Sequence, residues 1–419
     1  MIKELPWYDK IQFGALMLMA AAMPITWRLG LWAAILIGAI SIVKFVVQRG
    51  TFNKALDRDS RIQLYALLAY MLIILVDALF CSDRAEGIHI FFRKGGLLIF
   101  AISMFLGDTS YLDKKHLQSL AYALVASMSA YFLFRAGIAV YKVINGATWS
   151  SVTSMSSSLG ISYFDTHHHH AYSTLYANTA ILAAYWLLQS RWKEIKEWHR
   201  GLLIVSIMFS ILYIILVNSR AGMTTMYAVE LACVGHLFIS TKLWKPTVIA
   251  LVLTAGFTFG AEKLIPGYTD RVSSTISNIT SEEPKDERIS INRTAFDAIK
   301  TKPIMGLGVG DYHTRLVEEY DFNSNYNAHN QYTETLLASG IIGLLPLLVY
   351  LLWPAYMVLR RRSRLWFPML MLCGTIVVNI AFESMLERQM GLLFIGFVYI
   401  YILLILSHEE NKFGHVSKS

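Results

Sequence analysis

The side chains that could do chemistry gather in one polar stretch, residues 290–345, of an otherwise apolar chain. The stretch reads SINRTAFDAIKTKPIMGLGVGDYH, then a short polar run, then NAHNQYTETLLASGIIGLL. His329 within it can take a proton near neutral pH, for example from a sugar hydroxyl. Asn330 could orient the imidazole or a substrate hydroxyl, and a helix cap formed by the two residues is the alternative interpretation. The stretch therefore predicts a site for acid–base chemistry.

Two arginines at separate places in the chain could hold an anion. Arg220 lies in NSRAG, where Asn218 or Ser219 can cap the next helix, whose positive dipole end suits a phosphate or pyrophosphate. An interfacial arginine that reaches to the lipid headgroups is an equal alternative. Arg293 lies near Lys300 on the polar face of a predicted helix, where it could hold an anionic headgroup or face solvent. We predict that both arginines bind an anion, and both alternatives stay open.

Further polar side chains are expected on the same side of the membrane. His167–His170 are consecutive, and neighbours on a helix point in different directions, so all four cannot bind one metal. We predict neither a metal nor a cofactor, and we expect His169 or His170 to line the site unless the run is structural. Glu383 could orient an arginine or bind an acceptor, with Arg388 beside it, and an internal ion pair is the alternative.

The polar stretch itself is predicted to fold as two short helices around a turn. An amphipathic helix over 290–301 shares one apolar face among Ile291, Ala295, Ala298 and Ile299. Pro303 ends that helix, and the run GLGVG at 306–310 forms a tight turn. No Gly-Lys-Ser/Thr follows, so the run is no phosphate-binding loop. A second short helix starts at or just after Asp311 and carries His313, a further predicted substrate-binding residue.

The elements that must position these residues are predicted to be membrane-spanning helices. The chain has 419 residues, of which 55% are hydrophobic and only 16% charged, and apolar runs recur from end to end. The runs are long enough to cross a bilayer as helices and do not alternate as barrel strands do. The sequence predicts an all-α integral membrane protein of about twelve spans, at residues 11–27, 29–47, 62–80, 91–107, 117–134, 171–189, 201–217, 221–241, 245–262, 335–358, 365–383 and 389–406.

The placement of Lys and Arg predicts the orientation. One set of short connections carries more than twice as many of them as the other set, which puts both termini in the cytoplasm. The net charge of +8 is explained in this way, and no nucleic-acid partner is predicted. The expected organisation is a set of nine spans at 1–262, a large outer loop with the catalytic residues at 263–334, and three spans with a cytoplasmic tail at 335–419. In a bacterium the outer side is the periplasm, which has no ATP, so a reaction there needs an already activated substrate.

Three motifs in order, NSRAG, NRTAFDAIKTKPIMGLGVGDYH and NAHNQYTETLLASGIIGLL, resemble the O-antigen ligase and polymerase superfamily. The resemblance implies a GT-C-like glycosyltransferase of the inner membrane that is inverting and independent of metal. It implies an undecaprenyl-pyrophosphate-linked glycan as donor, and lipid A–core for a ligase or another lipid-linked glycan for a polymerase as acceptor, all among membrane lipids. By the same resemblance, Arg220 and Arg293 hold the pyrophosphate and His329 is the base or orients the acceptor. Glu383 matches an expected acidic position only loosely, and the histidine run has no counterpart.

Two other functions compete with an O-antigen ligase acting in lipopolysaccharide biosynthesis. A polymerase of surface polysaccharide would use the same donor, and the sequence does not decide between the two. A transporter of lipid-linked glycans is the alternative from another class of protein. Such a transporter should have paired repeats and broken helices near the midplane of the membrane. The collection of polar residues at one face favours an enzyme.

Overall fold

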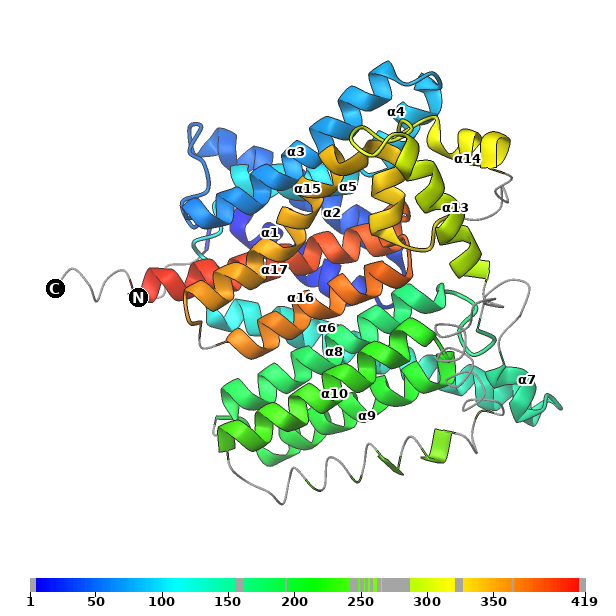
Figure 1. Ribbon diagram of the computed structural model, residues 1–419. Helices are drawn as coiled ribbons and strands as arrows, with labels where there is room; N and C mark the ends of the chain where they lie inside the picture. Colours follow the sequence, from blue (N-terminus) through cyan, green and yellow to red (C-terminus); the bar gives the residue numbers. More distant parts are fainter. Residues whose placement is uncertain are drawn as a thin grey trace. The chain divides into compact units, whose positions relative to one another are not determined.

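The residues that the computed structural model describes are 5–154, 162–192, 194–241, 248, 252, 255–256, 259–261, 265, 287–320, 327–363 and 365–413. Every element assigned in these residues is a helix (Figure 1), which confirms the predicted all-α class. The chain divides into two compact units. Unit 1 comprises residues 1–120, 287–373 and 380–419, and unit 2 comprises residues 121–286 and 374–379.

Seven helices are long and apolar enough to cross a membrane, or eight if the bent pair α4 (Arg84–Arg93) and α5 (Gly95–Leu106) counts as one span. The seven are α2 (Trp27–Val47), α3 (Arg58–Phe80), α6 (Lys114–Ile144), α9 (Glu197–Val217), α10 (Arg220–Thr241), α15 (Gln331–Arg360) and α17 (Gln389–Phe413). The protein is thus a multi-pass membrane protein, but the predicted number of twelve spans is not confirmed.

The other predicted spans have different outcomes. The runs at 11–27 and 365–383 form the shorter helices α1 (Trp7–Ala22) and α16 (Trp366–Phe382). The run at 171–189 forms α8 (His170–Arg191), whose buried polar side chains lower its hydropathy. Most of the run at 245–262 lies outside the described residues.

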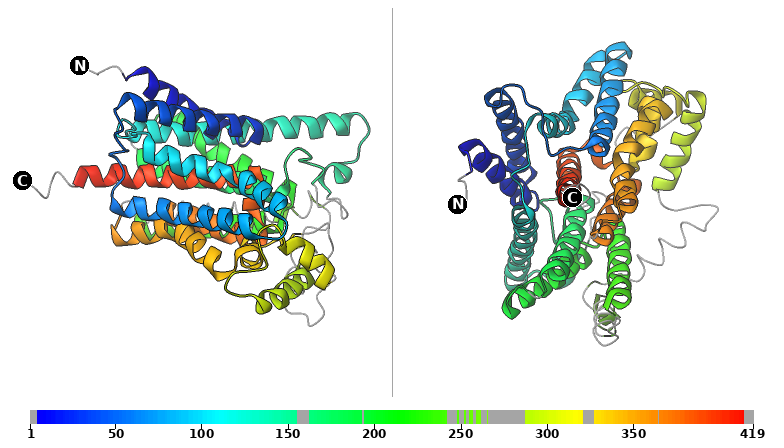
Figure 2. Two further views of the ribbon diagram at one scale, coloured as in Figure 1. Left: turned by 90° about the horizontal axis from the view of Figure 1, so that it is seen from above. Right: turned by 90° about the vertical axis from the view of Figure 1, so that its left-hand side faces the viewer.

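The core of unit 1 surrounds α17. From Gln389 to Ser407 this helix is apolar on all sides, and 94% of the residues in its most apolar 18-residue stretch are buried. This is expected for a helix at the centre of a bundle. It packs against α2, α5 and α15 (Figure 2). The hydroxyl of Tyr399 donates to the Leu351 carbonyl of α15 over 2.8 Å. A central helix of this kind holds the start of α15 and the connection before α17 at one end of unit 1, where His329 and Glu383 of the predicted site lie.

Helix α15 is broken at Gly340, whose φ of 61° and ψ of −160° are not helical. The break leaves backbone groups unpaired inside the helix, and a neighbouring turn satisfies them. The N–H groups of Leu307 and Gly308 donate to the carbonyls of Leu337 and Ala338 over 2.7 and 3.1 Å. A Cβ at position 340 would lie 2.3 Å from the Ile304 carbonyl oxygen, so only glycine fits. Backbone pairing of this kind allows a broken helix at the edge of a membrane.

The turn that pairs with α15 is the predicted glycine run, and it is confirmed. Gly306 and Gly308 have φ of 74° and 106°, which favours glycine. Carboxylates at the end of α3 and beyond the turn fasten it, since Asp77 accepts from the Val309 N–H and Asp311 accepts from the Ser82 N–H over 2.8 Å. The turn therefore connects the loop helices rigidly to the spans of unit 1.

The predicted loop helices are confirmed with small shifts. The first is α13 (Glu287–Thr301), which begins three residues before its predicted start and ends where expected. Its four predicted apolar residues are all buried. The second is α14 (Tyr312–Tyr320), which starts directly after Asp311.

Unit 2 is built mainly from α8, α9 and α10, with the larger part of α6 and the short helix α7 (Trp149–Thr153). Small and polar side chains lie between α8 and α10. A Cβ on Gly222 would lie 2.4 Å from Thr174, and the Asn178 amide donates to the Gly222 carbonyl over 3.1 Å. Such contacts are typical of helix pairs in membranes, and they fix the start of α10.

Candidate active site

His329 and Glu383 come together at the end of unit 1 that carries α13 and α14. Nδ1 of His329 lies 3.2 Å from Oε2 of Glu383. The carboxylate side chain is 4% exposed and the imidazole 19% exposed. A buried carboxylate at one ring nitrogen fixes the ring's orientation and can balance the charge that the ring gains with a proton. The loosely matched Glu383 is thus the direct neighbour of the predicted base.

The backbone at His329 is strained and held in place. Its φ of 48° lies in the left-handed region, which is uncommon for a residue with a side chain and typical of functional sites. Its N–H donates to Asn327 Oδ1 over 3.0 Å. The preceding peptide is held by the Asn292 amide, which donates to the Ala328 carbonyl over 3.1 Å. These contacts fix the direction in which the imidazole leaves the chain.

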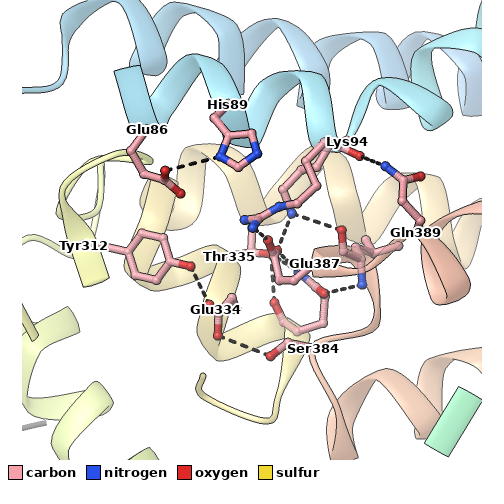
Figure 3. Close-up of polar contacts among 12 residues, drawn as sticks. Glu86, His89, Lys94, Tyr312, Glu334, Thr335, Ser384, Glu387 and Gln389 are labelled. Atoms are coloured by element: carbon pink, nitrogen blue, oxygen red, sulfur yellow. Dashed lines mark hydrogen bonds and ion pairs between the residues drawn. The ribbon is translucent and has the colours of Figure 1, made fainter. Parts of the chain in front are cut away.

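Glu334 joins the two segments that carry His329 and Glu383. Its Oε2 accepts from the Ala328 N–H over 2.9 Å and from the Ser384 hydroxyl over 3.2 Å. Ala328 precedes the histidine and Ser384 follows the glutamate. Its Oε1 accepts from the Tyr312 hydroxyl of α14 over 2.6 Å (Figure 3). One buried carboxylate thereby sets the relative position of both members of the pair.

A second carboxylate, Glu387 on the short helix η1 (Met385–Glu387), lies beside this group, and its side chain is 11% exposed (Figure 3). It contacts the ammonium of Lys94, which is buried between α4 and α5, and accepts from the Gln331 amide over 3.1 Å. Burial alone would raise the pKa of Glu387, but the nearby Lys94 charge outweighs it and the pKa is lowered. Gln331 also accepts from the Leu386 N–H over 2.7 Å. The network ties η1 to the start of α15.

Asn330 is a helix cap. Its Oδ1 accepts from the N–H groups of Tyr332 and Thr333 over 2.9 and 3.2 Å at the start of α15. The capping alternative is therefore confirmed for this residue, and its predicted contact with substrate stays a prediction.

The remaining predicted residues of unit 1 lie on three elements. Arg293 is exposed on α13, directly after Asn292, which holds the peptide before His329. His313 is half-buried at the start of α14, and Arg388 is exposed between η1 and α17. Arg293 thus lies on a helix that is hydrogen-bonded, through Asn292, to the segment that carries His329.

Arg220 is the first residue of α10 in unit 2 and is half-buried. Ser219 caps this helix as predicted, since its Oγ accepts from the Gly222 N–H over 3.3 Å. Asn218 has a φ of 55° and ends α9 in the left-handed conformation, which turns the chain sharply into α10. The guanidinium therefore leaves the chain at a helix N-terminus, where an anion is favoured.

The histidine run of unit 2 has separate positions for its members. His169 caps α8, with Nδ1 accepting from the Ala171 N–H over 3.4 Å, and His170 is the buried first residue of that helix. Among the described residues, no group of three or more His, Cys, Asp or Glu side chains could hold a metal. The predicted roles of His169 and His170 toward substrate stay predictions.

A buried polar cluster surrounds Asp165, just before the histidine run, and it was not predicted from the sequence. The carboxylate accepts from the hydroxyls of Tyr131 and Tyr213, and His168 and Arg135 lie 3.6 and 3.7 Å from it. Burial alone would raise the pKa of Asp165, but these donors and charges lower it well below its usual range. An acidic residue three positions before a histidine was the only available signal, and it did not identify partners on α6 and α9.

Residues 203–348 match a family model described as O-antigen ligase. The matched part contains Arg220, Arg293 and His329, and it ends before Glu383. No curated protein matches the chain. About a third of this multi-pass membrane protein is therefore similar to the O-antigen ligase family.

Proposed function

We propose that the protein transfers a glycan from undecaprenyl pyrophosphate to lipid A–core on the periplasmic face of the bacterial inner membrane. The observation that carries the proposal is the contact between His329 Nδ1 and Glu383 Oε2. His329 lies in a strained segment within the matched residues 203–348, and Glu383 lies beyond them. A base oriented by a buried carboxylate is what attack by a sugar hydroxyl needs.

The proposed reaction is a single displacement at the anomeric carbon. The acceptor hydroxyl oxygen forms the new glycosidic bond while the bond to the pyrophosphate oxygen breaks, which inverts the configuration. Because Nδ1 faces Glu383, Nε2 of His329 takes the hydroxyl proton. The leaving group departs as undecaprenyl pyrophosphate. The reaction therefore balances with the donor and the acceptor alone, without a nucleotide or a metal.

Arg220 and Arg293 are assigned to the pyrophosphate. The leaving group gains negative charge in the transition state, and fixed cations that face it lower the barrier. Arg220 is supported by its place at a capped helix N-terminus and Arg293 by its exposure on α13. Arginine also suits the task because its planar donors can bind two phosphate oxygens at once.

Turnover by purified protein in liposomes tests the proposal. With lipid-linked glycan and lipid A–core present, the expected products are glycosylated lipid A–core and undecaprenyl pyrophosphate, and His329→Ala should form neither. Movement of lipid across the bilayer without a new glycosidic bond would refute an enzyme of any kind. A longer lipid-linked glycan, formed without use of lipid A–core, would identify a polymerase instead.

A further inference from the structure

The turn between α13 and the buried glycine run exposes two large apolar side chains. Ile304 is 61% and Met305 is 70% exposed, whereas the following residues 306–311 are all buried. The turn is held firmly, because the carbonyls of Pro303 and Ile304 accept from the N–H groups of Ile341 and Ile342 over 3.0 and 3.2 Å. A soluble surface rarely presents such side chains on a backbone fixed in this way.

The same hydrogen bonds place the turn at the end of an apolar stripe on α15. The stripe starts at the exposed pair Ile341 and Ile342, and further exposed residues follow at steps of three or four along this helix, namely Leu345, Val349, Leu352 and Tyr356. This spacing puts them on one face. In a helix that spans a membrane, an exposed apolar face of this kind contacts lipid. Ile304 and Met305 extend that face beyond the break in the helix.

The length of α15 sets the depth of the turn. Arg360 and Arg361 end the helix, and their charges mark one edge of the hydrocarbon region. From there to Gly340 is about 20 residues, or about 30 Å at about 1.5 Å per residue, which equals the hydrocarbon thickness of a bilayer. The residues that pair with positions 341 and 342 therefore stand at the opposite edge of the hydrocarbon.

We propose that the turn 302–305 inserts into the bilayer, with Ile304 and Met305 among the acyl chains of bulk phospholipid. The exposed Lys302 then stands at the level of the headgroups, where an ammonium on a flexible stem is favoured. The inserted turn anchors α13, and with it Arg293, at a fixed depth near the membrane surface. This assignment concerns the contact with lipid and does not depend on glycan transfer.

Nitroxide labels in full-length protein reconstituted into liposomes test the insertion. Ile304→Cys and Met305→Cys should collide more often with oxygen than with a water-soluble nickel complex, as should Ile342→Cys on the lipid-facing stripe. Glu318→Cys, exposed on α14, should have the opposite preference. The native cysteines Cys81, Cys233 and Cys373 are buried, and unsubstituted protein gives the labelling background. Greater access of nickel to both turn positions would overturn the proposal.

A benzophenone side chain introduced at position 305 provides a second measurement in cells, where the native membrane is present. The expected photoproduct is a phospholipid adduct, which is absent when the benzophenone is at position 318. Adducts formed with another protein, and none with lipid, would mean that the turn is a protein-docking surface and would overturn the insertion.

Discussion

The replacement Glu383→Gln tests the central pair most directly. The glutamine keeps the size of the side chain but removes the charge that faces His329 Nδ1 at 3.2 Å. Because the carboxylate side chain is only 4% exposed, water cannot fully replace it. A hydrogen bond to a charged group contributes about 1.5–3 kcal/mol. If this contact strengthens as the imidazole takes the proton, its loss slows the reaction by about 10- to 100-fold.

Release of undecaprenyl pyrophosphate by purified protein measures this loss. The fall should be in kcat, because the interaction strengthens only as the proton moves. Glu318→Gln is the matched control, since it makes the same chemical change on an exposed face of α14 in the same unit. It should leave the rate unchanged. Both variants should elute from a sizing column like the unsubstituted protein.

A rate for Glu383→Gln within about twofold of normal, where the charge contributes less than about 0.5 kcal/mol, would refute this reasoning. It would mean that the Glu383 carboxylate only takes part in a structural hydrogen-bond network and that His329 acts without its charge. A lower affinity for the acceptor at unchanged kcat would instead assign Glu383 to acceptor binding, which is one of the roles expected from the sequence.

Three further predictions concern separate features. Arg220→Ala and Arg293→Ala should each reduce turnover by about 10- to 100-fold, through loss of a charged hydrogen bond to the leaving group, while the lysine variants retain part of the rate. Gly340→Ala should abolish recovery of folded protein from the membrane, because a side chain there is strained by about 1–3 kcal/mol and meets the Ile304 carbonyl; Gly137→Ala, in open space, should have no effect. Asp165→Asn should lower the thermal inactivation temperature, since breaking a buried ion pair costs about 3–5 kcal/mol. The lowered pKa of Asp165 means that its contribution is complete above about pH 4 and is lost only in stronger acid, so the effect of the variant should be constant from about pH 5 to 8.

Local features of the site could be predicted from the sequence, because they depend on residues close together in the chain. The end of α13, the glycine turn and the serine cap before Arg220 are of this kind. The contact of His329 with Glu383 joins residues 54 positions apart and depends on how α15, η1 and α17 pack. The same holds for Lys94 and Glu387, which no local pattern pairs.

The break at Gly340 was also not predicted, and its reason differs. The run 335–358 is apolar throughout, and hydropathy therefore indicated one continuous span. What breaks the helix is the partner that pairs with its backbone, the turn around Gly306 and Gly308. The glycine at 340 permits that approach but does not require it, since several other glycines within the helices have open space around them.

The break divides α15 into two parts with different tasks. The part after Gly340 is long enough by itself to cross the hydrocarbon, at about 30 Å, so the part before it need not lie in lipid. That first part carries Glu334 and the Asn330 cap and leads directly from His329. Charged side chains are costly in hydrocarbon and tolerable where other polar groups surround them, as Tyr312 and Ser384 surround Glu334 here. In the proposed function, the same helix therefore anchors the protein in the membrane and presents the proposed base just outside it, where the proposed lipid-linked donor and lipid-anchored acceptor would carry their reacting groups.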